Sequence, residues 1–300
     1  MKRSEPFHSV RRAPIAAENH VPRRLQTFLQ DLEVTESSEE VWELIVDLGT
    51  SLRLPCIDFI SANDYHDWTC AQFIRTSYDA SWLHQFNDDP ALYRWSYFRS
   101  HGMSCLTPIT VGIEFLDEYH QLPEARVNVL REAARRGIRA GFSIPLRQYA
   151  PAQSALMTFA GDLSRSELLE VIRTDGWTLN AGALAAHQRY LLHFAQEFPD
   201  RNSITPKQQE LLELIGGGLL DKQIAELLDI SVSAVRQRLN ALLQKTGMNN
   251  RVELATLAMS LGVLPHPLSR PERDARTLVG EDVYVPPRPL KPRVMETDQG

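Results

Sequence analysis

The chain has 300 residues and a hydrophobic fraction of 43%, which gives room for two ordinary domains with buried cores. No apolar run approaches the roughly 20 residues of a membrane-spanning helix, and the basic N-terminus lacks the apolar segment of a signal peptide. The three cysteines are an odd number without CxxC spacing, which argues against a disulfide framework and a zinc site. We therefore expect a cytoplasmic protein with no membrane segment, metal or cofactor.

The net charge of −6 is distributed unevenly along the chain. Residues 25–202 hold 14 Lys and Arg against 24 Asp and Glu, whereas residues 203–251 hold six against five. The second segment is therefore only mildly basic. If it binds a nucleic acid, we expect the affinity to come from two copies acting together, because one copy neutralises few phosphates.

Residues 1–24 are predicted to form a flexible arm, since they contain basic side chains and prolines without hydrophobic periodicity. A helix is predicted next, because Ser37–Glu40 is a start signal. Apolar residues then follow at helical spacing: Val41, Leu44, Ile45, Leu48 and Leu52. Pro55 ends this pattern, and Cys56–Ile60 alternates as a strand does.

Aromatic residues are dense between residues 68 and 98. Among them, Tyr78, Trp82 and Phe86 are spaced by four residues, which on a helix places them on one face. Two interpretations stay open at this point. The aromatic residues belong either to an ordinary core or to the wall of a small-molecule pocket, in which Tyr hydroxyl and Trp NH groups orient the ligand.

Residues 123–140 are predicted to form a helix with a basic end, whose arginines cover the C-terminus and the solvated face: Arg131, Arg135, Arg136 and Arg139. Two strands are predicted after it, within Gly137–Leu146 and at Ser154–Ala160. Helices at both ends and strands in the middle predict an α+β domain with the layers of an α-β-α sandwich.

A long helix is predicted from about Leu179 to Phe198. Spacings of four and three alternate along one stripe of it, as in a short coiled coil: Leu184, Gln188, Leu191, Ala195 and Phe198. This stripe contacts either its own domain or a second subunit. Residues 199–203 read as a polar linker, so we expect one domain at 25–198, another at 204–264 and a Pro-rich disordered tail at 265–300.

The second domain is predicted to contain four helices. Thr205–Gln208 has the residues of a helix start, and Gly216–Gly218 ends that first helix. A supporting helix follows, with an apolar core of Ile224, Ala225, Leu227 and Leu228. The third helix begins at Ser231, and Asn250–Glu253 starts a fourth. The apolar residues of the fourth helix cover the module: Leu254, Leu257, Ala258 and Leu261.

The third helix has a buried face of Val235, Leu239 and Leu242 and an opposite face that is mostly polar. The residues of that exposed face are Val232, Ser233, Arg236, Gln237 and Asn240. Arginine pairs bidentately with guanine, and Gln or Asn with adenine, in the DNA major groove. Two short helices with these side chains on the second favour a helix-turn-helix over a merely solvated face.

This segment closely resembles the LuxR-type (GerE-like) helix-turn-helix over about 60 residues. The shared elements are Thr205-Pro206, Gly218-Leu219, Lys222-Gln223-Ile224-Ala225, Ile230-Ser231, Val235-Arg236 and Asn250-Arg251. The resemblance implies a homodimer that binds double-stranded DNA at inverted repeats. The residues expected to contact DNA are Lys222, Ser231, Val232, Ser233, Arg236, Gln237, Arg238, Asn240 and Arg251.

The upstream region, over roughly residues 40–198, resembles the autoinducer-binding domain of the quorum-sensing regulators. Gly137–Leu146 is close to a characteristic segment of that domain, and Ala155–Ala160 matches the strand behind it. The resemblance implies that Trp82 donates its indole NH to a lactone carbonyl and that Thr158 bonds the acyl carbonyl. The residues expected to line the ligand site are Tyr78, Trp82, Phe86, Trp95 and Thr158.

Two positions depart from the pattern of that domain. The position of the aspartate that receives the ligand's amide NH falls on Trp95, and the segment that supplies a second tryptophan is Thr107–Val111. A buried amide NH without an acceptor costs roughly 1–3 kcal/mol, or about 5- to 150-fold in affinity. We expect a sensor for an acyl-homoserine lactone or a different small molecule, with little response to ordinary lactones. A ligand-independent regulator, whose upstream domain only dimerises or binds proteins, is the alternative.

Two other classes of protein fit the sequence less well. Residues 25–202 contain no lysine, which argues against a domain controlled by phosphorylation. The chain has no GxSxG, GxGxxG, P-loop or HExxH motif, so we expect no enzyme and no catalytic residue. The sequence therefore predicts a DNA-binding transcriptional regulator of the quorum-sensing LuxR type.

Overall fold

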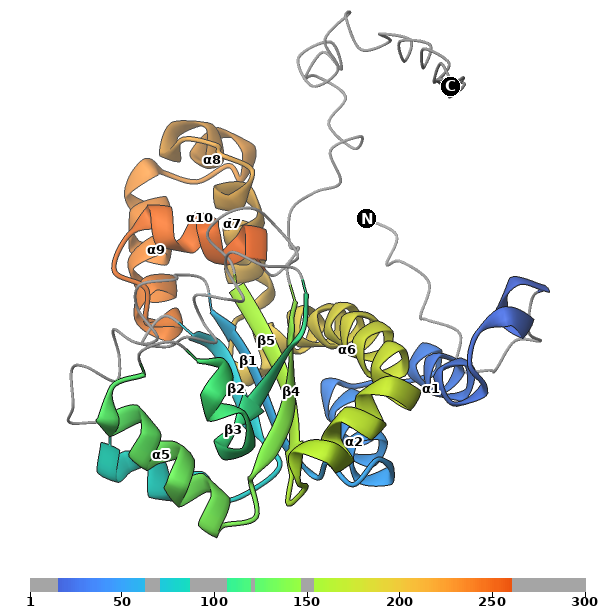
Figure 1. Ribbon diagram of the computed structural model, residues 1–300. Helices are drawn as coiled ribbons and strands as arrows, with labels where there is room; N and C mark the ends of the chain where they lie inside the picture. Colours follow the sequence, from blue (N-terminus) through green and yellow to red (C-terminus); the bar gives the residue numbers. More distant parts are fainter. Residues whose placement is uncertain (1–15, 63–70, 87–106, 120–121, 147–153, 261–300) are drawn as a thin grey trace, which may run out of the picture. The chain divides into compact units, whose positions relative to one another are not determined.

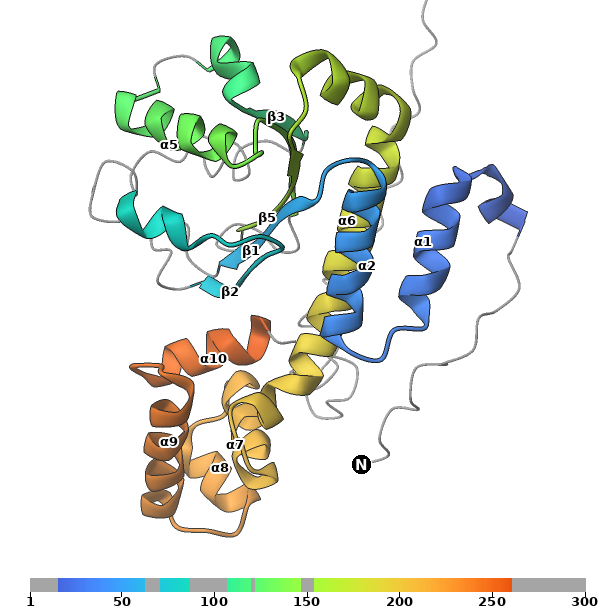
Figure 2. The same ribbon diagram turned by 90° about the horizontal axis from the view of Figure 1, so that it is seen from below.

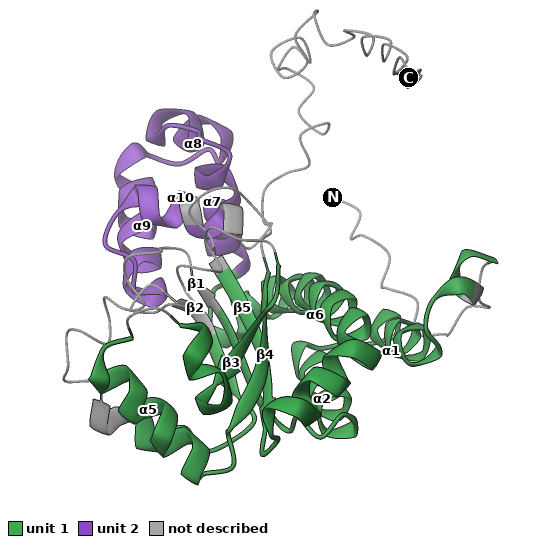
Figure 3. Cartoon of the chain, viewed as in Figure 1, with its two compact units in different colours: residues 1–205, 260–262 green, residues 206–259, 263–300 purple. Residues whose placement is uncertain are grey.

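The computed structural model describes residues 16–62, 71–86, 107–119, 122–146 and 154–260. The chain forms two units, the first up to Thr205 and the second from Pro206 (Figure 3). The first unit contains a five-stranded sheet with helices on both sides, and the second is built from helices (Figure 1). An α+β domain followed by an all-helical domain is the fold class that the sequence predicts, and it is confirmed.

The first unit combines helices with short strands. Its α-helices are α1 (Arg23–Glu33), α2 (Ser38–Ser51), α5 (Glu124–Arg135) and α6 (Arg165–Arg201). Its 3-10 helices are η1 (Ala16–His20), η3 (Ser81–Phe86) and η4 (Ile113–Glu118). Its strands are β1 (Cys56–Ala62), β2 (Ala71–Thr76), β3 (Ile109–Gly112), β4 (Ala140–Pro145) and β5 (Ser154–Gly161).

The strands form one antiparallel sheet in the order β2-β1-β5-β4-β3. β1 and β5 lie at its centre, and β2 and β3 are its edges. The sequence did not predict the two edge strands or α1. A strand of four residues such as β3 is too short to show a period, so only its pairing with β4 identifies it.

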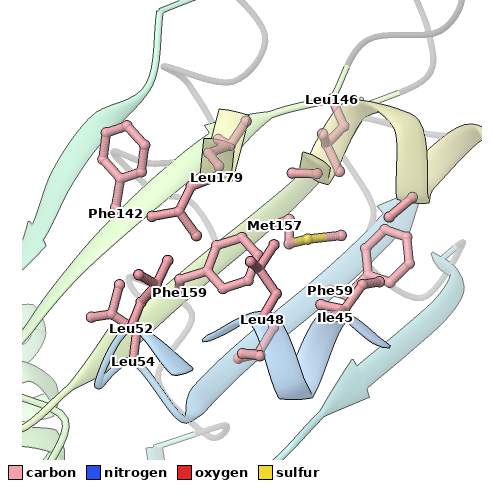
Figure 4. Close-up of a cluster of buried hydrophobic side chains, with 14 of the residues drawn as sticks. Ile45, Leu48, Leu52, Leu54, Phe59, Phe142, Leu146, Met157, Phe159 and Leu179 are labelled. Atoms are coloured by element: carbon pink, nitrogen blue, oxygen red, sulfur yellow. The ribbon is translucent and has the colours of Figure 1, made fainter. Parts of the chain in front are cut away.

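One face of the sheet packs against α2 and α6 and forms the main core, and we call it the α6 face. Its strand residues are between 0 and 7% exposed: Ile57, Phe59, Phe142, Ile144, Met157 and Phe159. Figure 4 shows Phe59, Met157 and Phe159 pointing at side chains of the covering helices, among them Leu48 and Leu179. Burial on this face is the principal source of stability of the unit.

The opposite face of the sheet lies on the side of η3 and α5, away from α2 and α6 (Figure 2), and we call it the α5 face. Paired residues of neighbouring strands share a face, so the register defines its members. Its members on β1, β4 and β5 are Asp58, Ile60, Ser143, Leu156 and Thr158. Several of them are polar, which distinguishes this face from the α6 face.

Helix α6 is much longer than the sequence predicts. It begins at Arg165 instead of near Leu179, because Ser164 and Glu167 form a capping box in which Ser164 Oγ accepts a hydrogen bond from Glu167 N. The first part of α6 shows no clear apolar face in the sequence, because its apolar residues Leu169 and Trp177 are exposed. The helix also continues through Pro199 to Arg201, so the first residues of the expected linker are helical.

Two local expectations around the aromatic segment are wrong. Tyr78, Trp82 and Phe86 do not share one α-helix, because the helix here is a 3-10 helix that begins at Ser81, after Tyr78. The helix predicted over 123–140 ends at Arg135, since Gly137 adopts a φ of 81°, a left-handed conformation that stops a helix.

The second unit contains α7 (Pro206–Gly216), α8 (Asp221–Leu227), α9 (Val232–Thr246) and α10 (Arg251–Ser260). Its core residues are between 0 and 7% exposed: Leu211, Leu212, Ile215, Ile224, Ala225, Val235, Leu242, Leu254, Leu257 and Ala258. Leu227, expected in this core, is instead 64% exposed. On the short α8 the buried face is centred on Ile224 and Ala225, and Leu227 points away from it. Leu261 lies outside the described residues.

Candidate functional site

Helix α9 has defined ends that set its position in the second unit. Ser231 is its N-cap, and the Ser231 Oγ accepts a hydrogen bond of 3.1 Å from the backbone NH of Ala234. Gly247 ends the helix with a left-handed φ of 69°. Lys245 donates a hydrogen bond of 3.0 Å to Gln208, which connects the last turn of α9 to α7.

The side chains of α9 are divided between a buried and an exposed face. Val235 and Leu242 are fully buried. The exposed residues that the sequence assigned to DNA contact are Ser233, Arg236, Gln237 and Asn240. They are spaced by one, three or four residues, so they follow one stripe of the helix. Val232 and Arg238 are half-buried beside the stripe, and Ser231 is exposed at its start.

Lys222 and Arg251 are the two remaining residues expected to contact DNA. They differ in whether their side chains are available for a DNA phosphate or base. Lys222 is exposed on the first turn of α8. The Arg251 guanidinium donates to the Asp221 carboxylate at 2.7 Å and to the carbonyl oxygen of Leu219. Asp221 also lies 3.6 Å from Arg236. Arg251 therefore attaches α10 to the start of α8, and the carboxylate between the two arginines positions both.

On the α5 face, hydrogen bonds connect residues from three strands and the loop before η3. The Tyr78 hydroxyl donates to Asp58 Oδ1 at 2.7 Å, and the hydroxyls of Ser143 and Thr158 lie 2.9 Å apart. Asp58 and Ser143 are both register partners of Thr158. The structure therefore brings Tyr78 and Thr158, two residues that the sequence assigned to the ligand site, to one face of the sheet.

The acid-base properties of Asp58 and Tyr78 follow from their burial. Burial raises the pKa of Asp58 to about 6, although the hydrogen bond from Tyr78 lowers it in part. Burial also raises the pKa of Tyr78, and the neighbouring Asp58 charge raises it further. At neutral pH the pair is therefore a carboxylate that accepts a hydrogen bond from a neutral phenol.

Trp82 is 8% exposed on η3, where it packs against Val129 and Ala133 of α5. The guanidinium of Arg136 lies 5.3 Å from the centre of its ring, within the range of a cation–π contact. The backbone of Phe86 ends η3. Trp95 lies outside the described residues, so its assignment to the ligand site stays a prediction.

Sequence reasoning missed Asp58. The signal was present in the alternation of Cys56–Ile60, which places Asp58 on the face opposite Ile57 and Phe59. The sequence does not reveal what lies beside it, because Tyr78 and Thr158 are brought there by the fold. Within the described ranges, no group of three His, Cys, Asp or Glu side chains is arranged to hold a metal ion. No helix in these ranges is long and apolar enough to span a membrane.

Comparison with known proteins identifies the second unit. Residues 202–258 match the family described as bacterial regulatory proteins, luxR family. The response regulator Rre1 of Synechocystis sp. is 38% identical over 65 residues, which is 22% of this chain and 28% of Rre1. The chain thus matches little more than a quarter of the length of that relative.

A longer match extends beyond a single helix-turn-helix. The transcriptional activator protein AhyR of Aeromonas hydrophila is 28% identical over 190 residues, covering 60% of this chain and 72% of AhyR. Among solved structures, SdiA of Escherichia coli is similar with a TM-score of 0.47 and 17% identity, over 81% of this chain and 98% of that chain. The sequence match to AhyR supports relatedness outside the helix-turn-helix as well.

Proposed function

We propose how this chain, a LuxR-type transcription regulator with its family domain at residues 202–258, recognises DNA and is controlled. It acts in the cytoplasm as a homodimer, and each copy places α9 in the major groove of one half of an inverted repeat. The observation that carries this proposal is the exposed stripe of Ser233, Arg236, Gln237 and Asn240, which lies on one helix over a buried opposite face.

The central base contact is assigned to Arg236. Its side chain is 70% exposed and its guanidinium lies 3.6 Å from Asp221, so it is oriented but still accessible. A bidentate pair with guanine contributes about 1–3 kcal/mol of discrimination, or roughly 5- to 150-fold in affinity. Arg251, by contrast, is held by Asp221 and Leu219, so we assign it mainly to positioning α8 and α10.

The DNA proposal is tested by selecting bound sequences from a random duplex library with the full chain. The expected result is an inverted repeat, which Arg236→Ala binds at least about fivefold more weakly. The control is Lys207→Ala, which removes one exposed positive charge on α7 and leaves α9 unchanged. Selection of no shared sequence, or equal binding by Arg236→Ala, would contradict the proposal.

The second copy is proposed to pack along α6. Trp177, Leu184 and Leu192 are 66, 39 and 48% exposed on this helix. Trp177 and Leu184 are seven residues apart, so they lie on the same side two turns from each other. Exposed apolar side chains along a helix mark an interaction surface. We assign this surface to a second copy of the chain, because one mildly basic unit neutralises few phosphates and an inverted repeat binds two such units.

The dimer is tested by light scattering after size-exclusion chromatography. The double variant Trp177→Glu/Leu184→Glu is expected to convert a dimer of the full chain into a monomer and to weaken binding to the inverted repeat. Leu227→Glu is the matched control, since it places the same charge at a leucine that is 64% exposed on α8. A dimer that persists in the double variant would show that another surface joins the copies.

The first unit is proposed to be the sensor, with the ligand on the α5 face near Trp82, Tyr78 and Thr158. Supporting observations are the burial of Trp82 against α5 and the hydrogen-bonded polar groups on the same side of the sheet. Because Trp95 occupies the expected position of the amide-binding aspartate, ordinary acyl-homoserine lactones should change the melting temperature of the chain little. A large stabilisation by one lactone, lost in Trp82→Ala, would contradict that expectation.

A further inference from the structure

A row of polar side chains crosses the middle of the α5 face. Thr76, Asp58, Thr158 and Ser143 are successive register partners on β2, β1, β5 and β4. Directly paired residues of an antiparallel sheet have Cβ atoms about 4.5–5.5 Å apart. The row is therefore continuous, and Asp58 is its charged member.

Asp58 is only partly satisfied within this row. Its Oδ1 accepts the hydrogen bond from Tyr78, and among the described residues no donor bonds its Oδ2 and no cation pairs with it. Burial raises the pKa of Asp58 to about 6, so the carboxyl is mostly ionised at neutral pH although its side chain is half-buried. Carboxyl groups whose pKa is raised by burial concentrate at functional sites.

The row of the α5 face next to that of Asp58 is aliphatic on β1 and β5. Ile60 and Leu156 are register partners in the adjacent row, and both are half-buried, in contrast to the fully buried residues of the α6 face. They offer apolar surface immediately beside the carboxylate. A molecule that fits both has a hydrogen-bond donor, best a positive one, next to an alkyl chain.

The α5 helix carries a competing charge on the same side of the sheet. Arg126 is half-buried one turn before Val129 and Leu130, the buried face of α5, and burial lowers the pKa of its guanidinium. Among the described residues, Arg126 has no ion-pair partner. An anionic ligand is therefore the alternative that an experiment has to separate from a cationic one.

We propose that Asp58 determines the specificity of the sensor, by pairing with the protonated amine of a small amphipathic ligand whose alkyl part lies on Ile60 and Leu156. This inference rests on the proposed sensor role of the first unit. Tyr78 is its positioning residue, because its hydroxyl donates to Oδ1 and so orients the carboxylate. A lactone ring or an acyl carbonyl presents acceptors, which the carboxylate of Asp58 repels, and an amide NH is a weaker donor to that carboxylate than a protonated amine.

The experiment compares three probes of equal chain length with the full chain at pH 7.5: octylamine, 1-octanol and octanoate. Isothermal titration and the melting temperature measure their binding. Octylamine is expected to bind at least tenfold more tightly than 1-octanol and octanoate. Equal binding of octylamine and 1-octanol, or tighter binding of octanoate, would overturn the proposal without any variant.

Variants assign the selectivity to the carboxylate. Asp58→Asn keeps the size of the side chain and is expected to reduce octylamine binding to the level of 1-octanol. Asp47→Asn on α2, on the other side of the sheet, is the matched control and should keep the tenfold preference. If Asp58→Asn does not fold, Tyr78→Phe provides the second variant, since it keeps the charge and should retain the preference for octylamine with a shifted affinity.

Binding to the selected inverted repeat is measured on the same samples, which separates this inference from the proposed function. Absence of an amine preference in the natural chain, together with intact binding to the inverted repeat, overturns the role of Asp58 alone. Amine binding that depends on Asp58, together with an absence of specific DNA binding, supports this inference and contradicts the proposed regulator. Retention of the preference by Asp58→Asn overturns the inference directly.

Discussion

The two faces of the sheet are made by the same strands but differ in chemistry. On the α6 face, Phe59, Met157 and Phe159 are fully buried, whereas on the α5 face Ile74 is 56% exposed and Asp58 is charged. Successive strand residues point to opposite faces, so one alternating sequence determines both. The comparison indicates that one face supplies stability while the other is free to carry polar groups for binding.

The largest expected effect comes from removing a ring from the α6 face. Phe159→Ala should lower the free energy of unfolding by about 3–5 kcal/mol, because the cavity is enclosed by α2, α6 and the sheet. Leu156→Ala, three residues earlier on the α5 face and half-buried, should cost about 1 kcal/mol or less. Urea unfolding followed by circular dichroism measures both. Similar losses of unfolding free energy in the two variants would mean that the two faces are equally buried.

A second prediction concerns the free energy of unfolding at acidic pH, to which a histidine packed on the α6 face contributes. His187 is 4% exposed, its ring lies 5.7 Å from that of Phe59, and burial lowers its pKa from 6.5 to about 4. The pKa of His187 is lower in the folded chain than in the unfolded chain. The stability that neutral His187 contributes is therefore complete above pH 6.5 and is lost as the pH falls toward 4. By pH 5 the loss amounts to about 2 kcal/mol.

The measurement is the free energy of unfolding at pH 7 and pH 5 for the natural chain and for His187→Gln. The variant should lose about 2 kcal/mol less over this interval, since glutamine does not titrate. His193, also on α6, titrates in both proteins and cancels in the difference. Parallel pH profiles would show that His187 is not responsible.

The smallest expected effect is on the polar row of the α5 face. Thr158→Val removes the hydroxyl that lies 2.9 Å from that of Ser143 and should cost roughly 0.5–1.5 kcal/mol. A double-mutant cycle with Ser143→Ala isolates this hydrogen bond. A coupling energy above about 2 kcal/mol would contradict the view that the row contributes little to stability.

Most of the DNA-binding unit could be predicted from the sequence. The start of α9 at Ser231 and its buried residues Val235 and Leu242 follow from caps and periodicity, which are local signals. Leu227 is an exception, because α8 has only seven residues and two turns leave the direction of its buried face poorly defined. Leu239, expected on the buried face of α9, is half-buried. Each of these differences concerns the burial of one side chain and does not affect the predicted arrangement of the helices.

The sheet unit was predicted less completely, and the reasons are physical. The class and the strands β1, β4 and β5 were anticipated, but the first part of α6 was not, because Trp177 and Leu169 are exposed and hide the buried face. The four-residue spacing of Tyr78 and Trp82 suggested one α-helix. Instead Tyr78 bonds to Asp58 before the 3-10 helix begins, a contact between residues 20 positions apart.

The sequence by itself determined the helix-turn-helix, its exposed stripe around Arg236 and the α+β class of the first unit, because caps, glycine stops and apolar periods act over a few residues. Only the tertiary structure decided that Asp58 lies beside Tyr78 and Thr158, and that Arg251 is occupied by Asp221. Strand register and helix packing join residues distant in the chain, and no local period records which of them meet.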